Sequence, residues 1–142
     1  MIMTREGVNI PVRKTKGSCG YDIFCPEDIS LPNNIWKPID TGIKMEKGDI
    51  PEGFCALIAP RSSMGVKYKL RIANTVGVID SDYTMDTIKA MITVDVSDKG
   101  EGGVIIKQNE RILQMILVPF GIIQSELTPT EERKGGYGST GA

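Results

Sequence analysis

The sequence predicts an all-β fold, a distorted jelly-roll β-barrel with one short helix and a flexible C-terminal arm. Short runs rich in β-branched and aromatic residues recur at a spacing of roughly 8–12 residues, which is typical of β-sandwiches and barrels. The 16 glycines and 8 prolines are spread along the chain, as turn residues would be. Residues 124–142 have neither periodicity nor a core-forming run. We therefore expect a barrel domain at residues 1–123 and an arm at residues 124–142.

The first half of the chain is expected to form strands separated by turns. YDIFC at 21–25 is rich in aromatic and β-branched residues and stops at Pro26. Further strands are expected at 35–39, 41–47 and 53–59, with Asn-Asn, Asp-Thr-Gly and Gly-Asp-Ile-Pro-Glu-Gly as the turns between them. The last of these strands is too apolar to be half exposed, so we expect it in the core.

The second half contains the helix candidate, SSMGVKYK at 62–69, which is weakened by Gly65. Further strands are expected at 71–80, 87–97, 104–107 and 111–123. The first two of these strands flank SDYTMD. We therefore expect them to form a hairpin with a polar, aspartate-rich tip.

Composition and charge exclude several classes of function. The net charge is −1, from 17 basic and 18 acidic residues, so no overall field favours nucleic acid or an anionic membrane. An apolar run of about 18 residues is absent, and the N-terminus lacks the apolar core of a signal peptide. We expect a protein of the cytoplasm, or of a host-cell interior, with no direct nucleic-acid or membrane partner. The basic cluster at residues 13–16 is expected to be a solvated loop, with a local anion site as the alternative.

The absence of histidine narrows the chemistry further. The chain contains none, which removes Ser-His and Cys-His nucleophiles and histidine zinc sites. Any general base must then be a carboxylate, and any metal a hard, oxygen-liking ion such as Mg²⁺. The three cysteines, Cys19, Cys25 and Cys55, form no C-x-x-C pair, so we expect reduced and mostly packed thiols.

The segment APRSSMG at 59–65 is a candidate anion site. Arg61 supplies a planar fork of donors suited to phosphate, and Ser62 and Ser63 add hydroxyl groups. A helix that begins just after them would also present free backbone N–H groups. The alternative is an ordinary helix start, which needs no ligand.

The segment GVIDSDYTMD at 77–86 is a candidate source of the base. Asp80 and Asp82 are two residues apart, so in extended chain both side chains would face the same way. Asp80 also follows an apolar run, and burial there would make it a candidate base with a perturbed pKa. A solvated hairpin tip is the alternative reading of the same residues.

Three polar residues lie inside predicted strands and need a reason to be there. Asp22 follows Tyr21 within a strand, where aspartate is disfavoured, so a metal, a partner or an edge position is implied. Gln114 stands in the apolar run RILQMILVPF, where a buried amide must find hydrogen-bond partners; a structural role is favoured over ligand contact. Arg111 is likewise interpreted as a structural ion-pair residue.

The order of these motifs on one chain resembles the trimeric dUTPases. GYDIF, PRSSMG, GVIDSDY, ERILQ and GGYGSTG follow one another as the five motifs of that family do, over about residues 18 to 141. The resemblance implies a jelly-roll β-barrel, in agreement with the strand pattern. It also implies hydrolysis of dUTP to dUMP and pyrophosphate, by attack of water on the α-phosphorus with Mg²⁺ on the triphosphate. That activity would limit uracil incorporation into DNA and supply dUMP for dTMP synthesis.

The resemblance assigns roles to the third motif. Asp80 would orient and deprotonate the attacking water. Tyr83 would pack against the deoxyribose and leave no room for a 2′-hydroxyl. The residues implied to read uracil through their main chain are Asn74, Gly77, Val78 and Ile79. Wrong bases would leave buried polar groups unpaired, so such a site discriminates strongly.

The first, second and fourth motifs would hold the phosphates and the metal ion. The residues implied for the phosphates are Arg61, Ser62, Ser63, Gly65 and Gln114. Asp22 of the first motif would reach Mg²⁺ through the water ligands of the ion, which commonly keeps part of its hydration shell.

The resemblance further implies a homotrimer, with the arm of one subunit closing over a site that the other two form. The arm residues implied to bind substrate are Arg133, Tyr137, Gly138, Ser139 and Thr140. Of these, Tyr137 would lie over the uracil ring, while Ser139 and Thr140 would donate to the γ-phosphate. We expect the arm to be disordered in the free protein and ordered over bound nucleotide.

Two departures from the family pattern define the alternatives. Thr84-Met85-Asp86 replaces the usual x-Gly-Glu, which could alter the hairpin. The fifth motif is one residue short, so Lys134 could share the phosphate role of Arg133. A dUTPase-like binding or regulatory protein with weak activity is therefore an alternative. A dCTP deaminase shares the Arg-Ser-Ser turn but carries a catalytic glutamate in the strand after the third motif. This alternative is disfavoured, because here that strand, TIKAMITVDV, contains no glutamate.

Overall fold

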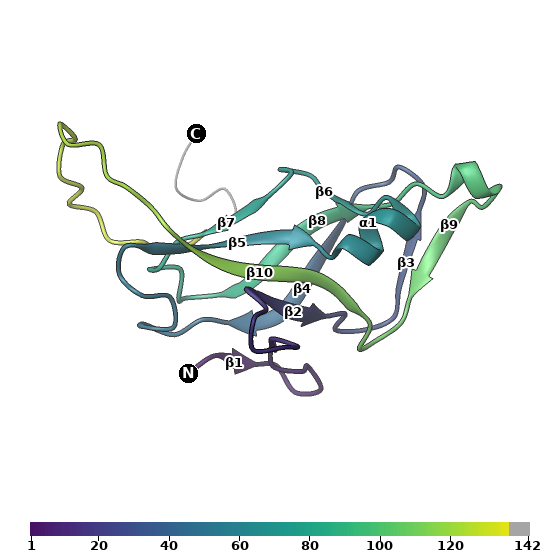
Figure 1. The fold of residues 1–142 in the computed structure, drawn as a ribbon, viewed down its shortest axis with the longest axis horizontal. Helices are drawn as coiled ribbons and strands as arrows, with labels where there is room; N and C mark the ends of the chain where they lie inside the picture. Colours follow the sequence, from purple (N-terminus) through teal and green to yellow (C-terminus); the bar gives the residue numbers. More distant parts are fainter. Residues whose placement is uncertain (137–142) are drawn as a thin grey trace.

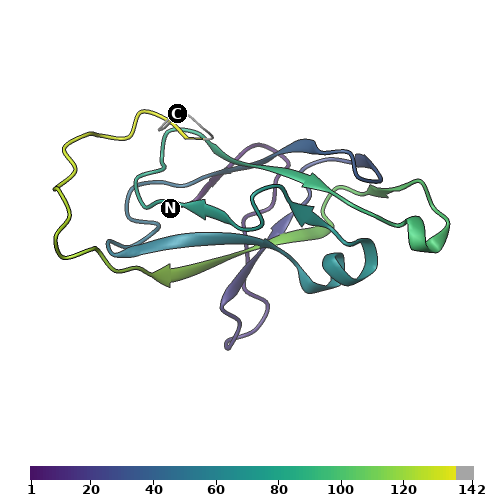
Figure 2. The ribbon, with the colours of Figure 1, turned by 90° about the horizontal axis from the view of Figure 1, so that it is seen from above.

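Two four-stranded antiparallel sheets pack against each other in a computed structural model that describes residues 1–136 (Figures 1 and 2). The first sheet contains, in spatial order, β1 (Met3–Thr4), β4 (Lys37–Lys44), β8 (Thr87–Thr93) and β6 (Arg71–Ile72). The second contains β2 (Gly20–Phe24), β10 (Arg111–Pro119), β5 (Phe54–Pro60) and β7 (Gly77–Ile79). A separate pair joins β3 (Ile29–Pro32) to β9 (Gly103–Ile106). The predicted all-β jelly-roll architecture is confirmed.

The core lies between the two large sheets. Ile23, Ile58 and Leu113 of the second sheet and Ile88 and Ile92 of the first belong to one cluster of buried side chains. Alternate residues of each strand point to the same face, so each sheet presents one apolar face to the other. Burial of each such side chain contributes roughly 1.5–3 kcal/mol. The prediction for β5 is half right, because Ala56 and Ile58 are buried whereas the residues between and around them are half buried.

The β3–β9 pair lies at one end of the molecule, and the segment after β10 extends past the opposite end (Figure 1). Strand β3 was not predicted, because ISLP is short and ends in a proline. Its pairing depends on a long-range contact: a Cβ on Gly103 would collide with the Leu31 carbonyl oxygen, so only glycine lets β9 approach β3 this closely.

Strand β4 is continuous, so the predicted Asp-Thr-Gly turn at 40–42 is wrong. The register between β4 and β8 shifts between Asp40 and Lys44, which makes this segment a bulge. Gly42 adopts φ +71°, a conformation that side chains disfavour. The buried Thr41 hydroxyl donates to the Ile88 carbonyl at 2.7 Å and so replaces a ladder hydrogen bond. A turn and a bulge use the same residues, and only the contact with β8 distinguishes them.

The predicted strand at 71–80 is interrupted, and only its first part pairs with 87–97 as the predicted hairpin requires. Residues 71–72 form β6, which pairs with β8, whereas 77–79 form β7, which pairs with β5 in the other sheet. A tight turn joins them, in which the Thr75 amide donates to the Ile72 carbonyl at 2.9 Å. Because each strand follows a different partner, the segment crosses from one sheet to the other.

The predicted helix is confirmed as α1 (Ser62–Tyr68). It begins after Arg61, whose backbone is extended, buries Met64 against the core, and ends at Lys69 in a left-handed conformation (φ 50°). A single 3₁₀ turn, η1 (Ser97–Lys99), follows β8. Within residues 1–136, no helix has the length and apolar character needed to cross a membrane.

The last strand ends earlier than predicted. Strand β10 stops at Pro119 rather than Ile123, and residues 120–136 contain no helix or strand. Figures 1 and 2 show this segment extending beyond the sheets and then turning back toward β7. The three cysteines are unpaired, as predicted, but they differ in burial: Cys19 is exposed, Cys25 buried and Cys55 half buried.

Candidate active site

The predicted functional residues gather around two different cavities that have no lining residue in common. The first, which we call the Asp80 cavity, has a volume of about 380 Å³ and lies between β7, β8 and the returning C-terminal segment. The second, the Arg61 cavity, has a volume of about 390 Å³ and lies between the start of α1, β2 and β10. The Asp80 cavity contains residues of the third motif, and the Arg61 cavity contains residues of the first, second and fourth motifs.

Asp80 and Asp82 occupy a turn rather than extended chain. The Tyr83 amide donates to the Asp80 carbonyl at 3.1 Å, which closes this turn directly after β7. Both carboxylates still face the same side, because both accept from Arg133: Asp82 Oδ1 lies 2.7 Å from its Nε, and Asp80 Oδ2 accepts from its Nη2. Asp80 is not buried, which was the condition for the sequence argument that made it a candidate base, since its side chain is 53% exposed.

The C-terminal segment lies directly over this turn. Arg133 is only 16% exposed and also donates from Nη1 to the Gly135 carbonyl at 3.1 Å. Next to it, a Cβ on Gly136 would overlap the ring of Tyr83. The main chain of Gly136 therefore rests on the Tyr83 ring, a contact that no other residue type would allow.

Tyr83 is buried and fixed at both ends. Its hydroxyl donates to the Thr87 carbonyl at 3.0 Å, while the ring belongs to the core cluster. Burial, followed by the nearby Asp86 charge, raises the pKa of the Tyr83 phenol, which therefore stays a neutral donor. The hydroxyl thus holds the ring at a fixed angle against the cavity.

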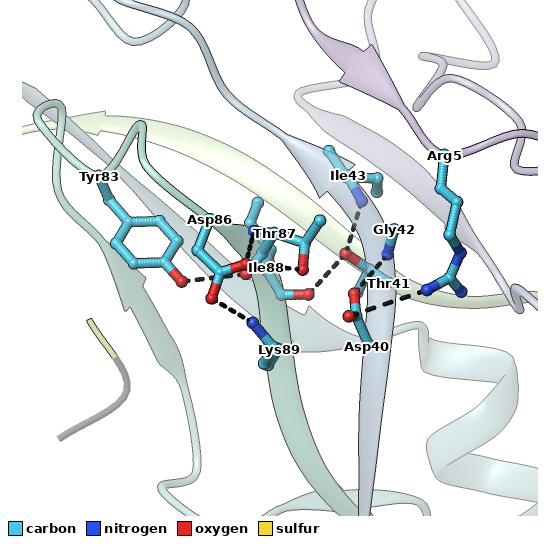
Figure 3. A network of polar contacts seen from close by, with 10 residues as sticks. All are labelled: Arg5, Asp40, Thr41, Gly42, Ile43, Tyr83, Asp86, Thr87, Ile88 and Lys89. Atoms are coloured by element: carbon cyan, nitrogen blue, oxygen red, sulfur yellow. Dashed lines mark hydrogen bonds and ion pairs between the residues drawn. The ribbon is translucent and has the colours of Figure 1, made fainter. Parts of the chain in front are cut away.

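The unusual Thr84-Met85-Asp86 segment supports this arrangement (Figure 3). Met85 packs against the core. Asp86 accepts the Thr87 amide at 2.7 Å through Oδ1 and pairs with Lys89 Nζ at 2.6 Å through Oδ2. The Lys89 hydrogen bond, followed by that of the Thr87 amide, lowers the pKa of Asp86. Asp86 therefore fixes the same residue, Thr87, whose carbonyl accepts from Tyr83.

A second row of polar contacts lies behind Thr87 (Figure 3). The Thr41 hydroxyl bonds the Ile88 carbonyl and accepts the Ile43 amide at 3.2 Å. At the same bulge, Asp40 accepts the Gly42 amide at 2.9 Å and faces Arg5 at 3.8 Å. The bulge in β4 thereby supports the start of β8 from the side opposite the cavity.

The turn between β6 and β7 forms another wall of the Asp80 cavity. Asn74 and Gly77 line it together with Val78 and Ile79 of β7. Thr75 adopts φ 66°, which is rare for a β-branched residue and marks local backbone strain. The predicted uracil-reading segment is therefore a constrained turn at the cavity.

The Arg61 cavity is built on strand register. On β10, Gln114 pairs with Asp22 of β2 on one side and with Ala59 of β5 on the other. Arg61 follows the end of β5, and Arg111 stands at the start of β10. The register alone therefore brings these side chains to one place.

Asp22 is the centre of this group. Its Oδ1 lies 2.9 Å from Arg61 Nε, and its Oδ2 lies 3.2 Å from Arg111 Nη1. The Asp22 side chain is only 11% exposed, so the two ion pairs hold it in a largely dehydrated position. The structural role predicted for Arg111 is confirmed.

Gln114 has a structural partner and a tight neighbour. Its Nε2 donates to the Pro60 carbonyl at 3.3 Å. On its other side, a Cβ on Gly20 would lie 2.6 Å from Gln114 Oε1, so Gly20 allows the amide to lie flat against β2. Structural satisfaction, the favoured prediction, is confirmed, and the side chain still lines the cavity.

The remaining predicted residues differ in whether they line a cavity. Ser62 lines the Arg61 cavity, whereas Ser63 and Gly65 line neither. Predicted residues that lie outside the part of the chain described by the structure are Tyr137, Gly138, Ser139 and Thr140.

Sequence reasoning missed several residues that do line the cavities. Lys89 and Met91 of β8 line the Asp80 cavity, and Lys14 and Ser18 line the Arg61 cavity. A lysine inside the apolar run TIKAMIT was a usable signal for Lys89. For Lys14 the only signal was the basic cluster, whose place in the fold depends on a distant strand.

Three comparisons with known proteins agree. The family model described as dUTPase matches residues 6–141. The deoxyuridine 5'-triphosphate nucleotidohydrolase of Hydrogenobaculum sp. is 38% identical over 142 residues, which cover 96% of this chain and 93% of that protein.

Solved structures give the same result. A mutant of the Staphylococcus bacteriophage 80alpha dUTPase, determined with dUpNHpp, superposes with a TM-score of 0.73 at 26% identity, covering 95% of this chain and 97% of that one. A mutant dUTPase from phage phi11 of S. aureus, described as revealing the coordination of a structural Mg(II) ion, gives a TM-score of 0.70 at 27% identity. That match covers 93% of this chain and 97% of the phage chain.

Proposed function

This chain belongs to the dUTPase family, whose activity is the hydrolysis of dUTP to dUMP, and we propose that its two cavities are the two halves of one active site. The chain is a hydrolase, a dUTP diphosphatase. The Asp80 cavity would take the nucleoside and the Arg61 cavity the phosphates. The observation that carries this proposal is the separation of the base from the phosphate-binding residues into two cavities without a shared lining residue.

This separation supports a site shared between subunits. A nucleotide must reach the base and the phosphate-binding groups at the same time, and one chain offers them in different cavities. In a closed homotrimer, the Asp80 cavity of one copy would meet the Arg61 cavity of the next, which gives three equal sites.

Asp80 would act as the general base. With no histidine in the chain, a carboxylate at the cavity wall is the available proton acceptor. It would take a proton from water as the oxygen attacks the α-phosphorus; the α–β bridging bond then breaks and pyrophosphate leaves. Arg133 contacts only Oδ2 of Asp80, so Oδ1 stays available to accept the water.

The turn and Tyr83 would provide specificity. Main-chain groups from Asn74 to Ile79 would pair with uracil, and cytosine or thymine would leave polar groups unpaired or collide. Tyr83, held by Thr87, would exclude a 2′-hydroxyl by packing on the sugar. A rigid aromatic wall suits this task better than a flexible side chain.

The Arg61 cavity would bind the phosphates through the Arg61 fork, the Ser62 hydroxyl and the Gln114 amide, with Ser63 and Gly65 supporting the turn at the start of α1.

Within residues 1–136, no group of three or more Cys, Asp or Glu side chains is placed to hold a metal ion. The residues therefore fit Mg²⁺ as an ion that phosphate and water oxygens mainly coordinate. Each Asp22 oxygen forms an ion pair with an arginine but keeps further lone pairs, so Asp22 could hold a water ligand of the ion. The bound ion would neutralise charge on the phosphates.

The arm would complete the site. We place the domain boundary near residue 123, with residues 124–142 as the arm. Residues 133–136 lie here on the Asp80 cavity of their own chain, so they would leave it when the arm closes over a neighbouring subunit. Arg133, Lys134 and the residues after Gly136 would then contact the nucleotide. The protein would work in the cytoplasm, or in a host-cell interior if its source is a phage or virus.

The alternative functions lose support. A regulatory protein with weak activity was favoured by the Thr84-Met85-Asp86 segment, yet that segment holds Tyr83 in place. A dCTP deaminase would need a glutamate in β8, and this strand contains none.

The test is a pair of inactive variants. Pyrophosphate release from dUTP should fall at least about 1,000-fold in Asp80→Asn, because the base is lost. Arg61→Ala should also release pyrophosphate from dUTP much more slowly than wild type. Refolded together in equal amounts, the two should regain about a quarter of the wild-type activity, since one site in each mixed cyclic trimer has both residues intact. If the mixture stays as inactive as its parts, the shared site is wrong; if wild type releases no pyrophosphate, the activity itself is wrong.

A further inference from the structure

The basic cluster that the sequence marked as a solvated loop is a closed structure at the Arg61 cavity. We define the basic loop as residues 13–21. It contains three basic residues and no acidic one. It begins and ends at a single antiparallel bridge between Val12 and Asp22, whose two backbone hydrogen bonds measure 2.7 and 3.3 Å. The loop therefore starts and closes on the backbone of the residue that holds Arg61.

The basic loop is held in shape by its own side chains. Arg13 Nη1 donates to the carbonyls of Lys16 and Ser18, at 3.0 and 3.1 Å, and its guanidinium lies over the Tyr21 ring. The Thr15 and Ser18 hydroxyls are 2.7 Å apart, and the Thr15 amide donates to the Ser18 hydroxyl. These contacts use Arg13 inside the loop and leave its other cations free to act outward.

Lys14 is the cation of the basic loop that lines the cavity. The charged residues of the cavity wall are Lys14, Asp22 and Arg61, and the last two form an ion pair. Lys14 makes no ion pair with any residue from 1 to 136. Arg111 also pairs with Asp22, so the cluster of Asp22, Arg61 and Arg111 already carries one positive charge, and Lys14 adds a second charge that is in no ion pair. Lys16, two residues along, does not line the cavity.

We propose that Lys14 is a further phosphate-binding residue, which adds a positive charge outside any ion pair to the Arg61 cavity and so strengthens its hold on a polyphosphate. The inference rests on the proposed function of that cavity. Arg61 and Gln114 fix the orientation of a phosphate group, because their donors are planar and held by neighbours. Lys14 contributes a mobile point charge, which suits an anion whose charge is spread over several oxygens.

The experiment compares Lys14→Ala with Lys16→Ala in the full-length protein. The two variants remove the same charge from the same loop, but only the first removes it from the cavity wall. We expect Lys14→Ala to raise the KM for dUTP about tenfold and to change kcat less than about threefold, because ground-state and transition-state binding of the distal phosphates are lost alike. Lys14→Arg should recover most of the loss, and Lys16→Ala should stay within about twofold of wild type.

A second measurement is independent of catalysis. Calorimetric titration with inorganic tripolyphosphate should show about tenfold weaker binding to Lys14→Ala than to wild type or Lys16→Ala. Equal binding of tripolyphosphate to the two alanine variants, or no binding to wild type, would overturn the role of Lys14. Loss of dUTP hydrolysis in the wild type, with tripolyphosphate binding still dependent on Lys14, would overturn the proposed function and leave this inference standing.

Discussion

The two cavities of this chain both contain charged residues but are built in different ways. The Arg61 cavity is formed by the register of three adjacent strands, and each oxygen of its central carboxylate, Asp22, forms an ion pair with an arginine. The Asp80 cavity is formed by turns and by the returning C-terminal segment, and its carboxylate, Asp80, is half exposed and paired with Arg133 of that segment.

This difference separates permanent from conditional contacts. The backbone positions of Asp22 and Arg111 are set by strand register, so we expect the Arg61 cavity to keep its shape when a ligand binds. The Arg133 pair joins a turn to a segment without helix or strand, so it can exchange at low cost. A hydrolase gains from this division, because phosphates need a fixed site while the segment over the base must let the nucleotide enter and leave.

The largest effect is expected from breaking the permanent region. Asp22→Ala should lower the free energy of unfolding by about 2–3 kcal/mol, because two partly buried arginines lose their partner; the estimate lies at the low end for buried pairs, since both arginines keep some exposure. Urea unfolding measures this change. Asp98→Ala, which removes an exposed partner of Lys69, is the control and should leave the midpoint unchanged. Equal midpoints for the two variants would contradict the comparison.

The next effect concerns the conditional region. Gly136→Ala should raise the KM for dUTP about tenfold while leaving stability unchanged, because a Cβ there would overlap a Tyr83 ring and hinder the arm from closing over the nucleotide. Gly121→Ala lies in the same segment, where a Cβ meets nothing within 4 Å, and should behave as wild type. Steady-state kinetics of both variants test whether the Gly136 contact matters for binding.

A smaller effect should follow from loosening Tyr83. Asp86→Ala removes the hydrogen bond to the Thr87 amide, so the preference for dUTP over UTP, as a ratio of kcat/KM, should fall about fivefold. Asp95→Ala removes a similar local cap, on Ser97, away from both cavities. If Asp95→Ala lowers the ratio as much, the effect is not specific to the Asp80 cavity.

The smallest effect at neutral pH concerns the thiols near the Arg61 cavity. Cys19 is exposed on the cavity wall and should react first with a thiol reagent, and pyrophosphate should slow this reaction.

Burial raises the pKa of Cys25 from 9.0 to about 11, so the folded chain favours its neutral thiol. The stabilisation from that thiol is complete below pH 9 and is lost as the pH rises through about 11. Alkylation of Cys25 in the native protein should follow the same window.

The sequence predicted most of what local pattern can determine. Strand positions, α1 and the pairing role of Arg111 follow from residue types and spacing. Two errors have one cause: the bulge at Gly42 and the break between β6 and β7 depend on which distant strand each segment pairs with. Turn-forming residues mark a change of direction but do not say whether a strand ends there.

The site was predicted in content but not in arrangement. Asp22, Arg61 and Gln114 were found separately, and register explains why they meet. The exposure of Asp80 could not be deduced, because an apolar run before a carboxylate says nothing of the turn that follows. The sequence alone indicated that Lys14 is a solvated charge, since only the bridge between Val12 and Asp22 brings it to the cavity.

The crossing of residues 71–79 between the sheets has a consequence for folding. With β6 hydrogen-bonded in one sheet and β7 in the other, neither sheet can complete its edge until both have come together. The other pairings also join distant parts of the chain, such as β2 with β10, so little structure is gained early. The molecule should therefore fold slowly and lose both sheets in one cooperative transition, with amide exchange in β6 and β7 reporting global rather than local opening.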